Sequence, residues 1–102
     1  MKDNRLLADY LQLELDHEYF YSGDAIIIDS RFQKWEPHFD WNQLMMVVEK
    51  IEEEDAWIDV KIDGNICSIE RGDSIIVKPI YQWKSKIEAV YNACVEYIKS
   101  KG

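Results

Sequence analysis

The clearest pattern in the chain is an apolar stripe near its C-terminus. Apolar side chains recur there at helical spacing, on one face: Ile87, Val90, Tyr91, Cys94, Val95 and Ile98. Ser85 and Glu88 stand at the spacing of a capping box, which is typical of the first turn of a helix. Lys99 and Lys101 suit the negative end of a helix dipole. The pattern therefore predicts an amphipathic helix over residues 85–99.

Two further segments have helical spacing. Residues 40–52 carry a second stripe: Trp41, Leu44, Met45, Val48 and Ile51. Asp40 can accept N–H bonds in the first turn of this helix, and Gln43 occupies its capping-box position. Near the N-terminus, Asp3 or Asn4 can cap a first helix that runs to about Leu15. Its inward residues are predicted to be Leu6, Leu7, Tyr10 and Leu11.

The segment after the first helix predicts a hairpin. Residues 18–22 and 25–29 are rich in aromatic and β-branched side chains, which favours two strands. Gly23-Asp24 between them is a turn signal. Residues 30–39 have weak periodicity and contain a proline, so we expect a loop there.

After residue 55 the hydrophobic period changes to two. Alternate residues point to opposite faces of a strand: Ile58, Val60 and Ile62 to one, and Trp57, Asp59 and Lys61 to the other. Asp63-Gly64 is a two-residue hairpin signal, which places Ile62 opposite Asn65. This register makes two apolar pairs: Val60 with Cys67, and Ile58 with Ile69.

A third strand completes this region. Arg71-Gly72-Asp73 is a second turn, residues 74–78 form the strand, and Pro79 ends it or marks its edge. The predicted order is helix, hairpin, helix, three-stranded meander, helix. This order predicts a single α+β domain over residues 1–102, with an antiparallel sheet of hairpin and meander strands layered with three helices as in a sandwich.

The charge of the chain narrows the function classes. Asp and Glu outnumber Lys and Arg by 20 to 12, so the net charge is −8. This sign argues against direct nucleic-acid binding and against binding to anionic membranes. It permits a basic protein partner or mimicry of nucleic acid. The alternative is that the charge only keeps the protein soluble.

The cysteines and the N-terminus indicate a cytosolic location. Cys67 and Cys94 form no CxxC pair, have no histidine at zinc-ligand spacing, and fall on apolar positions. Both are therefore predicted to be buried thiols in a reducing cytosol. The N-terminus does not resemble a signal peptide, and no apolar run is long enough to span a bilayer. No metal or cofactor is expected.

Several motifs resemble a family of small phage and prophage proteins, described as the phage ABA-sandwich domain. The likeness lies in these stretches: Asp40-Trp41, Leu44-Met45, Val47-Val48-Glu49-Lys50-Ile51-Glu52, Lys86-Ile87-Glu88-Ala89-Val90-Tyr91 and Val95-Glu96-Tyr97-Ile98-Lys99. The segment Leu6-Leu7-Ala8-Asp9-Tyr10-Leu11 resembles the family's opening helix, whereas Met46 departs from the proline expected after Leu-Met. The resemblance implies a sandwich-like fold and a phage or prophage origin. It implies no activity and no site residues.

Two clusters of side chains are candidate chemical sites. His38 and Asp40 form a His-x-Asp step, which would need His17 nearby to make a metal site. The favoured alternative is a surface histidine beside a helix cap, since this spacing defines no known ligand set. The acidic run Glu52-Glu53-Glu54-Asp55 could bind a divalent cation or a basic partner, and it opposes the helix dipole. A solvated helix end is the alternative for this run.

The aromatic residues are the remaining candidates for a binding surface. They are Trp35, Trp57, Trp83, Tyr81, Tyr19 and Tyr21. Trp57 points away from the apolar face of its strand, so it is a binding hot spot if that side is open and core if a helix covers it. A layered sandwich covers part of both faces of its sheet, which favours the core interpretation.

No nucleophile elbow, phosphate loop or paired acid–base motif is present, so we do not expect an enzyme. The function predicted from these features is an acidic protein-interaction module, encoded by a phage or prophage and acting on a host protein in the bacterial cytosol. One alternative is a small-ligand binder or hydrolase with a pocket lined by Trp35, Trp41 and Tyr81. Another is a homodimer or larger homo-oligomer with a structural or accessory role.

Overall fold

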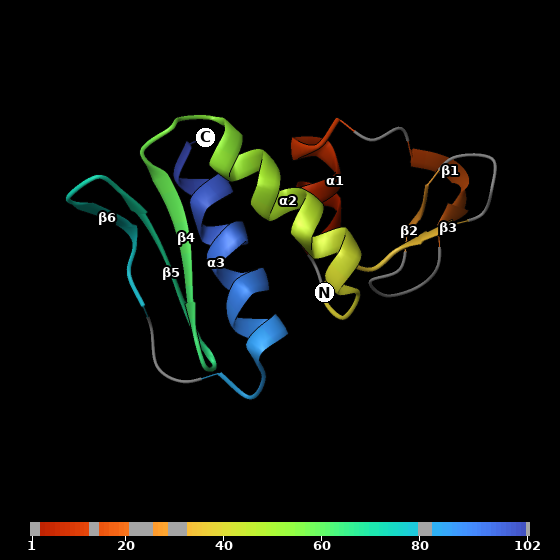
Figure 1. Cartoon of the computed structure of the whole chain (residues 1–102). Helices are drawn as coiled ribbons and strands as arrows, with labels where there is room; N and C mark the ends of the chain where they lie inside the picture. Colours follow the sequence, from red (N-terminus) through yellow and green to blue (C-terminus); the bar gives the residue numbers. More distant parts are fainter. Residues whose placement is uncertain (1–2, 13–14, 21–25, 29–32, 80–82, 102) are drawn as a thin grey trace.

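Figure 1 shows a computed structural model of the chain, which describes residues 3–12, 15–20, 26–28, 33–79 and 83–101. The elements follow in this order: α1 (Asn4–Tyr10), β1 (Leu15–Phe20), β2 (Ile26–Ile28), β3 (Gln33–Trp35), α2 (Trp41–Glu53), β4 (Ile58–Asp63), β5 (Ile66–Arg71), β6 (Ser74–Val77) and α3 (Lys86–Lys101). They form an α+β fold in which an antiparallel meander, β4–β5–β6, packs against helices. The predicted fold class is confirmed at this level.

Helix α3 is the centre of the fold. It contacts β5 and β6 of the meander sheet, and it also contacts α1 and α2 (Figure 1). Because neighbours surround it, its buried residues cover more than the predicted stripe: Ala89, Val90, Tyr91, Ala93, Cys94, Val95, Tyr97 and Ile98. The Ser85 hydroxyl accepts a hydrogen bond from the Glu88 N–H at 3.3 Å, which confirms the predicted cap.

Helix α2 begins at the predicted position. The Asp40 carboxylate accepts the Gln43 N–H at 3.2 Å. The Gln43 side chain does not complete a capping box, because its amide oxygen accepts the Glu36 N–H at 2.6 Å and so secures the segment before the helix. Its buried apolar residues are Leu44, Val47, Val48 and Ile51. Trp41, predicted to point inward, is 38% exposed at the margin of this face.

The meander has the predicted strands in a different register. The structure pairs Val60 with Ile69 and Ile62 with Cys67, a shift of two residues from the predicted pairing. Gly64 has φ +59° and Asn65 does not have a positive φ, as in a type II′ turn whose central residues are Gly64-Asn65 rather than Asp63-Gly64. A shift of two leaves every side chain on its original face, so the hydrophobic pattern could not exclude it.

The N-terminal third differs from the prediction in three ways. Helix α1 ends at Tyr10 and not near Leu15, because Gln12 takes the left-handed conformation with φ +60°. Strands β1 and β2 pair as predicted, but a third strand, β3, lies within the predicted loop 30–39. These strands form a separate sheet beyond α1 in Figure 1, so the single sheet predicted for hairpin and meander strands was wrong.

One face of the meander sheet packs on the helices, while the opposite face is not covered by any described element (Figure 1). Ile58, Ile69 and Val77 are buried on the covered face. Trp57 is 70% exposed. The expectation that a layered sandwich covers part of both faces, and with it the core interpretation of Trp57, was therefore wrong.

Asn4 forms a buried polar junction that joins three parts of the chain. Its side-chain oxygen accepts the Tyr91 hydroxyl at 2.8 Å, and its Nδ2 donates to His38 Nδ1 at 2.9 Å. Its backbone oxygen accepts the Trp35 indole N–H at 2.6 Å. Asn4 was predicted as a possible cap, whereas Asp3 is the capping residue of α1 and makes no side-chain cap bond. The junction instead connects α1 to α3 and to the segment before α2.

Both cysteines are free and buried, as predicted. Burial raises the pKa of the Cys67 thiol to about 11, and burial also raises the pKa of the Cys94 thiol. Since the thiolate is the reactive form, neither side chain is poised as a nucleophile near neutral pH.

Candidate functional site

The connection from α2 to β4 gathers more of the predicted site residues than any other described segment. We call residues 52–57 the acidic turn, since α2 ends and β4 begins across it. Five of the predicted residues lie in it: Glu52, Glu53, Glu54, Asp55 and Trp57. The four acidic residues follow one another at the C-terminal end of α2, where negative charge is unfavourable unless it is compensated.

Asp55 is compensated by Arg71, which ends strand β5. The guanidinium Nη2 and Nε lie 2.6 and 2.8 Å from Asp55 Oδ2, and the Trp57 N–H donates to Oδ1 at 3.0 Å. The Trp57 N–H and then the Arg71 guanidinium hold the pKa of Asp55 below its usual value. The Gly72 N–H also donates to the Trp57 carbonyl at 3.0 Å. These bonds fix the backbone that carries the Trp57 side chain.

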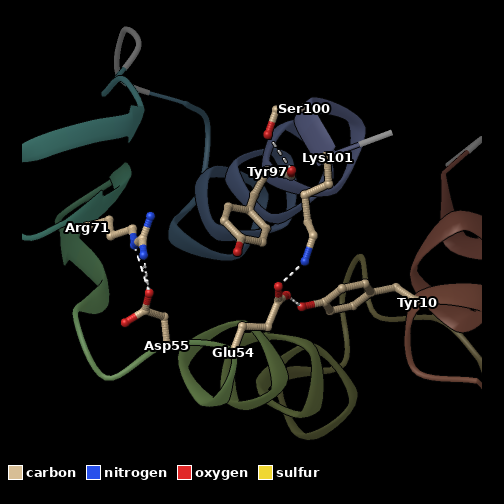
Figure 2. Close-up of polar contacts among 7 residues, drawn as sticks. All are labelled: Tyr10, Glu54, Asp55, Arg71, Tyr97, Ser100 and Lys101. Carbon is tan, nitrogen blue, oxygen red and sulfur yellow. Dashed lines mark hydrogen bonds and ion pairs between the residues drawn. The ribbon is translucent and has the colours of Figure 1, made fainter.

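Glu54 is compensated by the other two helices. Its carboxylate accepts the Tyr10 hydroxyl at the end of α1 and pairs with Lys101 at the end of α3. The Lys101 ammonium also lies over two aromatic rings, 5.7 Å from the Tyr10 centroid and 5.5 Å from the Tyr97 centroid. Figure 2 shows Tyr97 between this group and the Arg71–Asp55 pair. Burial, and then the Glu54 charge, raise the pKa of Tyr97.

A hollow of about 330 Å³ lies at this place, lined by the two ion pairs together with Ile58, Ile76 and Tyr97. Its charged groups face partners of opposite sign, so they hold the ends of the helices and the acidic turn together. A general acid or base needs a pKa near the working pH, whereas the pKa of Asp55 is moved away from neutrality. The arrangement thus serves as a rigid support for the acidic turn.

The outer acids of the turn are less constrained. Glu52 accepts the Val60 N–H at 3.4 Å, and Glu53 is exposed. Together with Asp59 on β4, they pair with no basic side chain in the described part of the chain. Two exposed carboxylates of the acidic turn and that of Asp59 therefore lack a basic partner among the described residues, and all three lie within five positions of Trp57 in the sequence.

The other predicted aromatic residues lie elsewhere. Trp35 is fully buried, so it cannot form the wall of an open pocket as one alternative function required. Trp83 is half-buried before α3, and its N–H donates to the Asn65 carbonyl at 3.0 Å. Tyr81 and Tyr21 lie outside the described residues, as does the side chain of Tyr19. Neither Trp35 nor Trp83 lies in the acidic turn or lines the hollow behind it.

His38 is part of the Asn4 junction and not of a ligand cluster. Its ring packs edge-on against Phe39, with centroids 4.3 Å apart. Burial is the main cause that lowers the pKa of His38. The side chain of His17 is not described. Among the described residues, no three His, Cys, Asp or Glu side chains come together to hold a metal ion.

Local sequence patterns contain little indication of the partners that support the acidic turn. Arg71 was assigned only to a β-turn, and Lys101 only to the end of a helix. Tyr10 and Lys101 reach Glu54 across separations of 44 and 47 residues, which no local pattern encodes. The one local signal was the unfavourable run of acids at a helix C-terminus, which called for compensating cations.

In the described ranges, no helix combines the length and the apolar character needed to cross a bilayer. No model of a known protein family matches the chain, and no curated protein and no solved structure matches it. The resemblance to the phage ABA-sandwich domain therefore rests on the motifs quoted above.

Proposed function

We propose that this protein is an interaction module that binds a basic surface of another protein through Trp57 and the acidic turn. The observation that carries the proposal is the 70% exposure of Trp57, whose backbone N–H and carbonyl are both hydrogen-bonded. An exposed indole on a rigid turn loses little conformational freedom when a partner covers it. Tryptophan is among the residues most enriched at binding hot spots for this reason.

The charge around Trp57 suggests which partner it fits. Glu52 and Glu53 in the acidic turn and Asp59 on β4 have no basic partners among the described residues, and the whole chain carries a net charge of −8. Such a surface attracts basic proteins at long range and repels nucleic acid. A basic surface normally used to bind nucleic acid matches this pattern, with the module acting as a charge mimic.

The biological setting of the proposal comes from the family resemblance. Similarity to phage ABA-sandwich proteins supports a phage or prophage accessory role in the cytosol of a bacterial host. The partner is then a host protein that binds nucleic acid or takes part in defence, and the module acts by binding rather than by catalysis.

A pull-down from host bacterial lysate tests this proposal. Wild-type protein, Trp57→Ala and Glu53→Lys are compared at low and high salt, with mass spectrometry as readout. Trp41→Ala is the matched control, because Trp41 is also exposed but lies at the opposite end of α2. Glu96→Lys on α3 controls for the change in net charge.

The proposal predicts one basic partner that is retained by wild type and by both controls. Trp57→Ala and Glu53→Lys should each weaken capture of this partner. Capture should also fall at high salt, because salt screens the attraction between exposed charges that lie farther apart than the Debye length, which is about 10 Å at 0.1 M and shorter at higher salt. Equal capture by Trp57→Ala and wild type would reject the acidic turn as the binding surface.

Self-association through β6 is a second candidate. β6 is an edge strand of its sheet, and Ile75 on it is 53% exposed. Edge strands present unpaired N–H and C=O groups that can pair with a second copy. The irregular register opposite Ile69 and Glu70, and Pro79 beyond the strand, limit the length of such a pairing. The mass in solution distinguishes the two candidates, since the first requires no dimer.

A further inference from the structure

We propose that a second hollow, between α3 and strands β5 and β6, binds a neutral single-ring aromatic compound. This hollow shares no lining residue with the hollow behind the acidic turn. It therefore represents a site of its own, independent of the function proposed above.

The size of the hollow suits one ring. Its volume is about 160 Å³. A protein cavity of about 150 Å³ takes up a benzene molecule, so this volume is sufficient for one six-membered ring.

The space exists because small side chains meet there. Ala89 and Ala93 of α3 face the hollow, and Cys67 of β5 and Val77 of β6 complete its apolar floor. All four residues are at least nine-tenths buried. Larger side chains at the two alanines would fill the hollow, as happens in most helix–sheet contacts of normal packing density.

An aromatic residue, Trp83, is among those that line the hollow, and its backbone N–H and carbonyl are both bonded to Asn65. The Trp83 N–H donates to the Asn65 carbonyl at 3.0 Å, and Asn65 Nδ2 donates to the Trp83 carbonyl at 3.1 Å. Indole and a ligand ring attract each other in offset or edge-on contact, which favours an aromatic ring over an aliphatic group.

The charges at the mouth favour a ligand without charge. Lys78 and Lys99 are balanced by Asp3 and Glu96, and Lys99 lies 3.5 Å from Asp3. The lining thus has no excess of either sign. Since the floor offers no ion to pair with a charged group, burial of a charge there is unfavourable.

The test uses the full chain and 4-fluorophenol as the probe, observed by ¹⁹F NMR and by the amide spectrum of the protein. Ala93→Leu fills the hollow and should weaken binding about tenfold or more, since the added side chain occupies the space of the ring. Ala56→Leu is the matched control, because Ala56 is exposed and does not line the hollow. Trp83→Ala removes the aromatic side chain without filling the space.

We expect half-saturation of wild type at a concentration on the order of millimolar, as is usual for a ligand of this size. The shifted amides should centre on Cys67, Ala89 and Ala93, and Ala56→Leu should bind like wild type. Benzoate and benzylamine, which carry charge, should bind more weakly than 4-fluorophenol.

The proposal is overturned if Ala93→Leu binds the probe as wild type does, or if the shifted amides lie away from this hollow. Absence of any shift in wild type at about ten times the expected half-saturation would also overturn it. If Ala93→Leu does not fold, the amide map of wild type and the binding of the probe by Trp83→Ala replace it. Shifted amides around the hollow and weaker binding by Trp83→Ala would support the proposal, and unchanged binding by Trp83→Ala would overturn it.

Discussion

Replacement of Asn4 by leucine tests whether the buried polar junction holds the fold together. Asn4 is 1% exposed, and leucine has the same number and branching of side-chain heavy atoms, so Asn4→Leu keeps the shape of the side chain while it removes the polar atoms. The variant removes the acceptor for the Tyr91 hydroxyl and the donor to His38 Nδ1. It leaves the Trp35 bond in place, because the acceptor there is the backbone oxygen of residue 4.

The size of the effect follows from the two groups left behind. A buried polar group without a partner costs about 1–3 kcal/mol. The Tyr91 hydroxyl is fully buried, whereas half-buried His38 can still reach water and adds less. We therefore expect Asn4→Leu to lower the free energy of unfolding by about 2–4 kcal/mol. For a domain of this length the total is about 5–15 kcal/mol, so the variant should still fold.

Urea denaturation followed by tryptophan fluorescence measures this difference, and Asn42→Leu on the exposed face of α2 is the matched control. The control should lie within about 0.5 kcal/mol of wild type. Tyr91→Phe removes the hydroxyl that Asn4→Leu leaves without an acceptor. The double variant should therefore cost at least about 1 kcal/mol less than the sum of the two single variants.

Two results would refute the reasoning. Asn4→Leu could be as stable as Asn42→Leu, in which case the junction would contribute nothing measurable. The effects of Asn4→Leu and Tyr91→Phe could instead be additive, which would mean that the two side chains do not interact in solution.

Three further predictions follow from local features. Burial lowers the pKa of His38 below 6.5, so the unfolded chain binds more protons than the folded chain as the pH falls past that value. The free energy of unfolding, measured by urea denaturation at each pH, should therefore decrease from pH 7 to pH 5. The decrease should be less steep in His38→Gln. Gly64→Ala should cost about 1 kcal/mol in thermal unfolding, because Gly64 has φ +59° and nothing within 4 Å of an added Cβ, whereas exposed Ser74→Ala should not. Asp40→Ala should cost about 1 kcal/mol by removing the α2 cap, whereas exposed Asp73→Ala should not.

The sequence specified the elements whose signals are local. The capping residues Asp40 and Ser85 lie at the starts of α2 and α3, where the pattern placed them. Hydrophobic spacing identified most of the buried faces, and the turns at Gly64 and Gly72 lie where glycine was present to supply positive φ. Each of these signals depends on residues within about four positions of one another, which is the range of helix and turn geometry.

Features that depend on contacts between distant segments were decided by the tertiary structure. The observed hairpin register differs by two residues from the predicted one. Both registers keep the apolar residues on one face, so the hydrophobic pattern cannot distinguish them, and packing against α3 and the turn geometry decide between them. Helix α1 stops at Tyr10 although no glycine or proline marks its end, and β3 forms inside a predicted loop by pairing with β2.

The exposure of Trp57 and the roles of Asn4 and Glu54 belong to the same class. Alternation along the sequence predicted that Trp57 points away from the apolar face of Ile58, but only the folded chain shows that its side chain is 70% exposed. Asn4 and Glu54 find their partners up to 87 residues away in the sequence. Local sequence therefore determined which helices and turns form, because their energies arise from neighbouring residues. Tertiary structure decided the register, the open face and the polar junctions, because their energies arise from groups that meet only after folding.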